Sequence, residues 1–118
     1  MQKATIILGP QGSGKSKKAF ELTGGNCTVI DFEDIRRKLT PALREAIITG
    51  LPIVVEGVRA ITPFIKQMAS VEKIGVRYPY ARNFQECAVP QLIFTSQNLT
   101  EDDFLDSRRF NIITLPAR

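Results

Sequence analysis

Short apolar runs alternate with segments of helical spacing along the whole chain. The runs are rich in β-branched residues and continuously apolar, which is typical of strands covered on both faces. Because a segment of helical or polar character separates each run from the next, the pattern predicts a three-layer α/β fold with a parallel five-stranded sheet and helices on both faces. The predicted strands are Ala4–Leu8, Cys27–Ile30, Leu51–Val55, Gln91–Thr95 and Phe110–Leu115.

Capping residues and apolar spacing predict the helices between these strands. Thr40 before Pro41 is typical of a helix start, and Gly50 is a natural stop. Alternating apolar and polar residues over Val71–Tyr80 predict an extended ribbon. The predicted helices are Lys15–Leu22, a helix capped by Asp31 that includes Ile35 and Leu39, a helix from Pro41 to Gly50, Thr62–Met68, and a short acidic helix from Thr100 through Leu105.

Composition narrows the class of protein. The 118 residues are 43% hydrophobic and 24% charged, which suits a single globular domain over residues 1–118. Apolar runs fall well short of the ~20 residues of a membrane span, so we expect a cytoplasmic protein without membrane attachment. The chain has no histidine, so Cys27 and Cys87 cannot complete a zinc site and we expect both to be reduced. A net charge of +4 permits a polyanionic partner without requiring one.

The stretch GPQGSGKS, Gly9–Ser16, follows the first predicted strand and opens the first predicted helix. Glycines let backbone amides approach phosphates, a lysine supplies charge for the β- and γ-phosphates, and a hydroxyl can hold magnesium. The dipole of the helix that follows also favours an anion at this place. The residues that we expect to bind a nucleotide are Gly9, Gln11, Gly12, Ser13, Gly14, Lys15, Ser16 and Lys17.

These residues resemble the Walker A loop of the P-loop NTPases. The resemblance implies that Lys15 bridges the phosphates and takes part in catalysis, that Ser16 holds Mg²⁺, and that Lys17 adds an amide near the α-phosphate. The ligand it implies is ATP or GTP with Mg²⁺. The alternative is a glycine turn with a structural role only.

The strand IVVEG, Ile53–Gly57, delivers a carboxylate at its carboxyl end, where open parallel sheets bind ligands. Glu56 is therefore the candidate for the Walker B acid, which holds the metal or polarises the attacking water. The family usually has two acids here and this chain has one, so hydrolysis is expected to be slow. Asp31 is a rival for the metal, although a helix cap explains it equally well.

Two further stretches, PQLIFTSQNL and SRRFNIITL, resemble the sensor-1 strand and the arginine-phenylalanine strand of AAA+ ATPases, and more closely those of superfamily-3 helicases. The resemblance implies a catalytic polar residue at Gln97, with Asn98 as the alternative. It also implies that Arg109, or its neighbour Arg108, reaches into the nucleotide site of another subunit in a homo-oligomer. It implies the strand order 5-1-4-3-2, numbered in chain order.

The segment KIGVRYPYARN lies between these motifs, where the helicases carry a hairpin that contacts DNA. Its cations alternate with aromatic rings, a combination suited to phosphates and stacked bases. The residues that we expect to contact single-stranded DNA or another nucleic acid are Arg77, Tyr78, Tyr80 and Arg82. An edge hairpin with a structural role is the alternative.

Together these features favour an ATP- or GTP-binding NTPase that hydrolyses nucleotide with Mg²⁺ and serves DNA replication or processing in a phage or mobile element. A small-molecule or nucleotide kinase is the main alternative, and a nucleotide-binding regulator without hydrolysis is another. Strand order separates the first two. In the helicase group Gln91–Thr95 would lie between Ala4–Leu8 and Leu51–Val55, whereas in kinases those two strands are neighbours.

Overall fold

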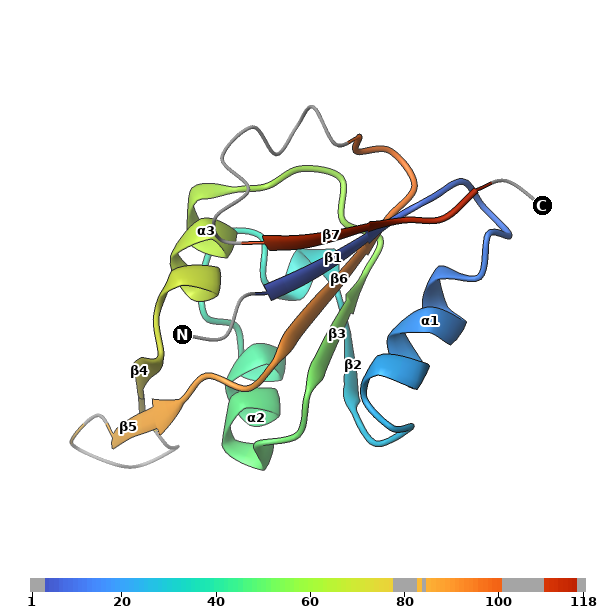
Figure 1. Ribbon diagram of the computed structural model, residues 1–118. Helices are drawn as coiled ribbons and strands as arrows, with labels where there is room; N and C mark the ends of the chain where they lie inside the picture. Colours follow the sequence, from blue (N-terminus) through green and yellow to red (C-terminus); the bar gives the residue numbers. More distant parts are fainter. Residues whose placement is uncertain (1–3, 78–82, 84, 101–109, 117–118) are drawn as a thin grey trace.

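The computed structural model describes residues 4–77, 83, 85–100 and 110–116 (Figure 1). Predicted and observed elements agree to within one or two residues at most ends. The strands are β1 (Ala4–Leu8), β2 (Thr28–Asp31), β3 (Ile53–Glu56), β4 (Lys73–Val76), β5 (Gln85–Ala88), β6 (Leu92–Ser96) and β7 (Phe110–Thr114). The helices are α1 (Lys15–Leu22), the 3₁₀ helix η1 (Phe32–Asp34), α2 (Pro41–Thr49) and α3 (Pro63–Ser70).

The main sheet has five parallel strands in the order β2-β3-β6-β1-β7. In chain order these are the predicted strands 2-3-4-1-5, so the predicted order is confirmed. β6 pairs with β1 through Thr5 and Ile93 and with β3 through Val54 and Ile93. The kinase order, in which β1 and β3 are neighbours, is therefore wrong for this chain.

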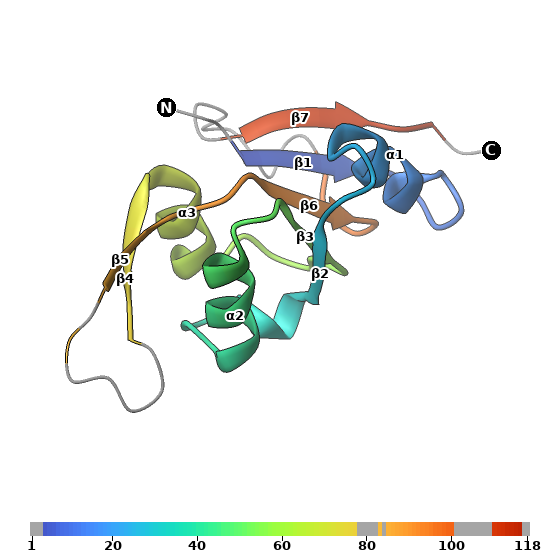
Figure 2. The ribbon, with the colours of Figure 1, turned by 90° about the horizontal axis from the view of Figure 1, so that it is seen from below.

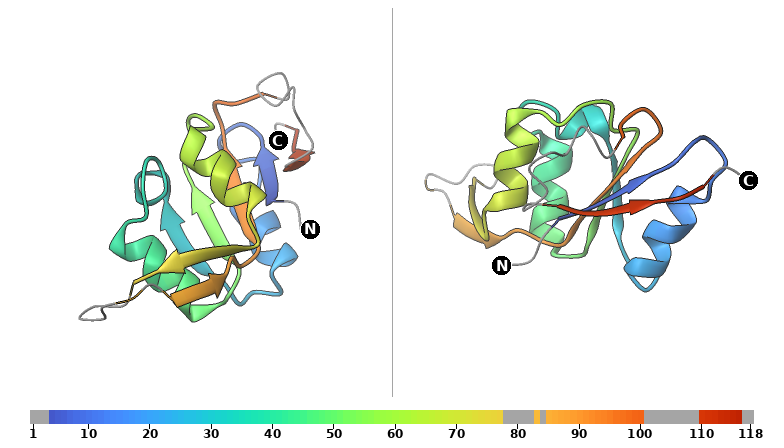
Figure 3. Two further views of the ribbon diagram at one scale, coloured as in Figure 1. Left: turned by 90° about the vertical axis from the view of Figure 1, so that its left-hand side faces the viewer. Right: turned by 45° about the horizontal axis from the view of Figure 1, so that its top comes forward.

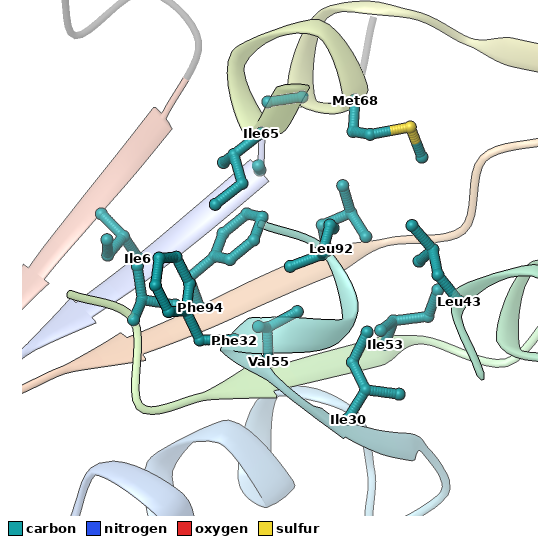
Figure 4. Close-up of a cluster of buried hydrophobic side chains, with 14 of the residues drawn as sticks. Ile6, Ile30, Phe32, Leu43, Ile53, Val55, Ile65, Met68, Leu92 and Phe94 are labelled. Carbon is teal, nitrogen blue, oxygen red and sulfur yellow. The ribbon is translucent and has the colours of Figure 1, made fainter. Parts of the chain in front are cut away.

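Helices cover both faces of the sheet, as predicted (Figures 1 and 2). The larger core lies on the face toward η1, α2 and α3, where strand residues meet helix residues (Figure 4). The ring of Phe94 in β6 packs edge to face against Phe110 in β7, with 6.2 Å between centroids. On the opposite face Ala19 of α1 packs against the strand residues Ile7, Val54 and Ile93. Successive side chains of a strand point to opposite faces of the sheet, so the strands contribute to two separate apolar layers.

Side-chain caps fix where α2 and α3 begin. The hydroxyls of Thr40 and Thr62 accept hydrogen bonds from the backbone N–H of Leu43 and Ile65, at 3.3 and 3.2 Å. A proline follows each cap at the first helical position. α2 ends at Thr49 and is capped by Gly50, whose φ of 79° is left-handed and so suits glycine. Both helices therefore stand where capping chemistry predicts them.

The predicted helix from Asp31 through Leu39 is wrong, because only the 3₁₀ turn η1 forms there. Asp31 does act as a cap, since its carboxylate accepts from the N–H of Glu33 at 3.2 Å. After η1 the carbonyl of Asp34, which a continuing α-helix would pair with a backbone N–H, instead accepts a hydrogen bond from the hydroxyl of Thr40 at 2.7 Å. Phe32 and Ile35 are both buried, and one turn is enough to place them in the core.

The predicted ribbon forms in part. β4 pairs with β5 as an antiparallel hairpin outside the main sheet, with Lys73 opposite Ala88. Figures 1 and 3 show it on the side of the molecule away from the carboxyl ends of the main strands. Its DNA-binding role stays a prediction, because Tyr78, Tyr80 and Arg82 lie outside the described residues. The acidic helix predicted to follow Thr100 also lies outside them.

Within the described part of the chain, no helix is long and apolar enough to cross a membrane.

Replacing Phe94 with alanine is expected to lower the free energy of unfolding by about 3 to 5 kcal/mol, because a fully buried ring leaves a cavity. Phe20→Ala is the matched control: that ring is 42% exposed on α1, and its loss should cost less than about 1 kcal/mol. Urea unfolding followed by circular dichroism measures both. Equal losses in the two variants would contradict the core described above.

Candidate nucleotide-binding site

The loop between β1 and α1 has a shape that only glycine fits at several positions. Gly12 and Gly14 have φ of 80° and 90°, in the left-handed region. At Gly9 a Cβ would lie 2.5 Å from Ser13 Oγ and 3.1 Å from the carbonyl oxygen of Leu115. The three glycines thus let the backbone fold closely around the start of α1, while Ser13 is buried beneath it.

The start of α1 presents backbone donors and a cation. α1 begins after Gly14, whose lack of a side chain leaves the first turn without a side-chain cap. Since the first N–H groups of a helix have no intrahelical acceptor, those of Lys15, Ser16 and Lys17 can bind an external anion. The Nζ of Lys15 donates to the carbonyl of Pro10 at 2.8 Å, across the mouth of the loop. This arrangement can bind a phosphate chain.

Gln11 lies in the same loop, where its side chain is exposed.

Glu56 meets the loop at the carboxyl end of β3. The hydroxyl of Ser16 donates to Glu56 Oε1 at 2.9 Å, although the two residues are 40 apart in sequence. Asp31 is opposite Glu56 in the pairing of β2 with β3, so a second carboxylate reaches this edge. Its hydrogen bond to the N–H of Glu33 shows that it caps η1.

The donor atoms at this place fit Mg²⁺. A hydroxyl and a carboxylate oxygen are ligands that this ion prefers, and it usually takes the rest from phosphates and water. Among the described residues, no group of three or more histidine, cysteine, aspartate or glutamate side chains is arranged to hold a metal alone. Ser16 and Glu56 would therefore hold Mg²⁺ together with a bound nucleotide rather than before it.

The turn after β6 is held by Ser96, a residue that sequence reasoning missed. Its buried hydroxyl donates to the carbonyl of Val58 at 2.6 Å and accepts from the N–H of Asn98 and Leu99 at 3.3 and 3.1 Å. Gln97 and Asn98 are exposed at the tip of this turn. A hydroxyl directly after a buried strand and before two amides was the available signal.

One cavity of about 650 Å³ brings most of these side chains together. Gln97 and Asn98 both line it, so the structure does not separate these two alternatives. Its charged lining residues are Lys15, Asp31, Glu33, Glu56 and Arg59. Arg59 and Glu33 were not among the predicted site residues, and nothing in their local sequence marks them.

Of the residues predicted to bind a nucleotide, Lys15 and Ser16 line this cavity, whereas Gly9, Gln11, Gly12, Ser13, Gly14 and Lys17 do not. Arg109, with its neighbour Arg108, lies outside the described residues. Arg77 follows β4, in the hairpin on the other side of the molecule (Figure 3).

Comparison with known proteins identifies the fold. No protein-family model matches the chain, and no curated protein matches it significantly in sequence. Among solved structures it is similar to NtrX from Brucella abortus in complex with ATP, with a TM-score of 0.58, 12% identity, and coverage of 98% of this chain and 33% of that one.

The ADP complex of the same protein has a TM-score of 0.58 and 15% identity over 98% of this chain and 32% of that one. The chain thus spans about a third of the length of these NtrX structures. At such identities the likeness concerns the fold alone. The chain therefore has a three-layer α/β fold with a five-stranded parallel sheet, similar to the part of NtrX that it matches.

Proposed function

We propose that this chain binds ATP or GTP with Mg²⁺ through residues 9–17 and hydrolyses it. The observation that carries the proposal is the hydrogen bond of 2.9 Å between Ser16 and Glu56. It joins the hydroxyl of a phosphate-binding loop to the carboxylate at the end of β3, at the place where Mg²⁺ and the γ-phosphate would lie. The ATP and ADP complexes of NtrX support a nucleotide as the ligand.

The side chains around the cavity divide the chemistry among them. Lys15 would leave the carbonyl of Pro10, its partner at 2.8 Å, and neutralise charge on the β- and γ-phosphates. Mg²⁺, when bound, would supply further charge stabilisation to the phosphates. Glu56 would accept a proton from the attacking water or orient it, and Gln97 would hold that water in line with the γ-phosphate. Asn98 is the alternative to Gln97.

The hydrolase is favoured over the kinase by the position of β6 between β1 and β3. In this order the turn after β6 lies beside the phosphate loop, because the N–H of Gly9 donates to the carbonyl of Ser96 at 3.1 Å. Polar side chains from that turn can therefore reach a water at the γ-phosphate. A regulator that binds nucleotide without hydrolysis is an outcome of the tests below.

We also propose that the chain acts as a homo-oligomer on nucleic acid, in DNA replication or processing of a phage or mobile element. The support is the resemblance of SRRFNIITL and KIGVRYPYARN to segments of superfamily-3 helicases. Arg109 would stabilise the transition state in a neighbouring subunit. Arg77, Tyr78, Tyr80 and Arg82 would contact single-stranded DNA.

Lys15→Ala should weaken the binding of Mg·ATP by at least about tenfold, because it removes a charge-assisted contact to the phosphates. Lys18→Ala is the matched control, since Lys18 lies on the same helix but does not line the cavity. Isothermal calorimetry measures both affinities. Equal affinity in Lys15→Ala and the parent chain would rule out the proposed nucleotide site.

Glu56→Gln should lower the rate of phosphate release by about 10² or more, because it removes the carboxylate that would hold Mg²⁺ and act on the attacking water, while Lys15 and the loop amides still bind ATP. Glu21→Gln, an exposed glutamate on α1, is the control of equal charge change. A colorimetric phosphate assay measures the rates. If the parent chain binds ATP and releases no phosphate even at high protein concentration and with single-stranded DNA, the hydrolase proposal fails and the regulator is favoured.

Arg109→Ala should lower the rate of hydrolysis by about 10³ to 10⁵. A mixture of Arg109→Ala with Lys15→Ala chains should recover part of the rate, because one interface can then combine an intact loop with an intact arginine. Hydrolysis assays over a dilution series test the homo-oligomer, and assays with and without single-stranded DNA test the action on nucleic acid. Specific activity that does not change with concentration or mixing would contradict the homo-oligomer. Activity that does not change with DNA would contradict the action on nucleic acid.

A further inference from the structure

Two arginines share one glutamate and one aromatic ring beside the cavity of about 650 Å³ that Lys15, Ser16 and Glu56 line, called the phosphate cavity below. The carboxylate of Glu33 forms ion pairs with Arg59 Nη2 and, at 3.5 Å, with Arg36 Nη1. Both guanidinium groups also lie over the ring of Phe32, at 5.2 Å for Arg59 and 5.8 Å for Arg36. The ring itself is buried, with 2% of its residue surface exposed. The four side chains form a cluster in which Phe32 and Glu33 belong to η1, Arg36 follows it, and Arg59 lies in the loop after β3.

The two arginines differ in what else they face. Arg59 lines the phosphate cavity together with Lys15 and Ser16. Arg36 instead lines a separate cavity of about 210 Å³ on the far side of Glu33, with Arg37 and Lys38. Among the described residues, Lys15 and Arg59 are the two cations that line the phosphate cavity.

The backbone next to Arg59 is held in place. The N–H of Val58 donates to the carbonyl of Thr95 at 3.0 Å, and the carbonyl of Val58 accepts from the hydroxyl of Ser96 at 2.6 Å. Val58 is itself 1% exposed. The side chain of Arg59 therefore starts from a fixed point three residues after Glu56, while its guanidinium is exposed and can turn.

The ion pair between Arg59 and Glu33 is easily exchanged. Both side chains are more than half exposed, at 57% and 54%, and exposed pairs of this kind add little to the stability of a fold. A phosphate carries more charge than a carboxylate and matches the two parallel donors of a guanidinium. A terminal phosphate in the same cavity would thus compete well with Glu33 for Arg59.

We propose that Arg59 binds the terminal phosphate of a nucleoside triphosphate within its own subunit, and that Glu33 holds the guanidinium at the cavity until that phosphate arrives. This inference rests on the proposed nucleotide site and adds a property to it. Arg59 selects triphosphate over diphosphate, because ADP has no terminal phosphate for it to bind. Stacking on the ring of Phe32 keeps the guanidinium of Arg59 near the site both with and without a bound nucleotide.

The test compares the affinities for ADP and for a non-hydrolysable ATP analogue, both with Mg²⁺, by calorimetry. In Arg59→Ala the preference for the triphosphate should fall by about tenfold or more, with the affinity for ADP unchanged. In Glu33→Gln the affinity for the triphosphate should rise several-fold, since the competing carboxylate is gone. Arg59→Lys keeps the charge without the two-pronged geometry and should lie between parent and alanine variant.

Arg36→Ala is the matched control, because Arg36 has the same two partners but does not line the phosphate cavity. It should leave the preference unchanged, and thermal unfolding should show that all variants are folded. If the parent chain binds neither nucleotide, the proposed function and this inference fail together. If binding is lost in Lys15→Ala but the preference is the same in Arg59→Ala, only the role of Arg59 is wrong.

Discussion

Parallel pairing of β1, β3 and β6 is the constraint on which the candidate site depends. Parallel strands bring their carboxyl ends to one edge of the sheet, so segments far apart in the sequence meet there. β6 lies between the other two, and it anchors both neighbours. The N–H of Gly9 donates to Ser96 and that of Val58 donates to Thr95, at 3.1 and 3.0 Å. The loop before Lys15 and the loop that carries Arg59 are thus both hydrogen-bonded to the end of β6.

The two faces of the sheet contribute unequally to this arrangement. The face toward η1, α2 and α3 holds most of the described buried apolar side chains, so it supplies most of the hydrophobic stabilisation. On the other face Ala19 brings α1 close to Ile7 and Ile93, while Phe20 and Val29 are 42% and 46% exposed. The larger core stabilises the sheet. The smaller one chiefly fixes α1, and with it the helix N-terminus that follows the phosphate loop.

The charged side chains of the cavity show which groups a bound triphosphate would need. Asp31, Glu33 and Glu56 line it with two cations, Lys15 and Arg59. Carboxylates repel a nucleoside triphosphate, so the proposed ligand needs positive charge beyond that of the side chains. The free N–H groups at the start of α1 supply part of it, and Mg²⁺ would supply the rest. Asp31 also caps η1, and Glu33 pairs with Arg59, which accounts for these two carboxylates at a phosphate site.

Local chemistry in the sequence determined the elements and the phosphate loop. Thr40 with Pro41 marks a helix start wherever the helix later packs, and GPQGSGKS demands left-handed glycines because of its own backbone path. The strand order was also predicted, but from a resemblance rather than from local pattern. The shortness of the helix after Asp31 was not predicted: there the hydroxyl of Thr40 occupies the carbonyl of Asp34, a contact six residues along the chain that helical spacing does not reveal. Tertiary structure alone paired Arg59 with Glu33, 26 residues away, since contacts between distant segments depend on how the whole sheet packs.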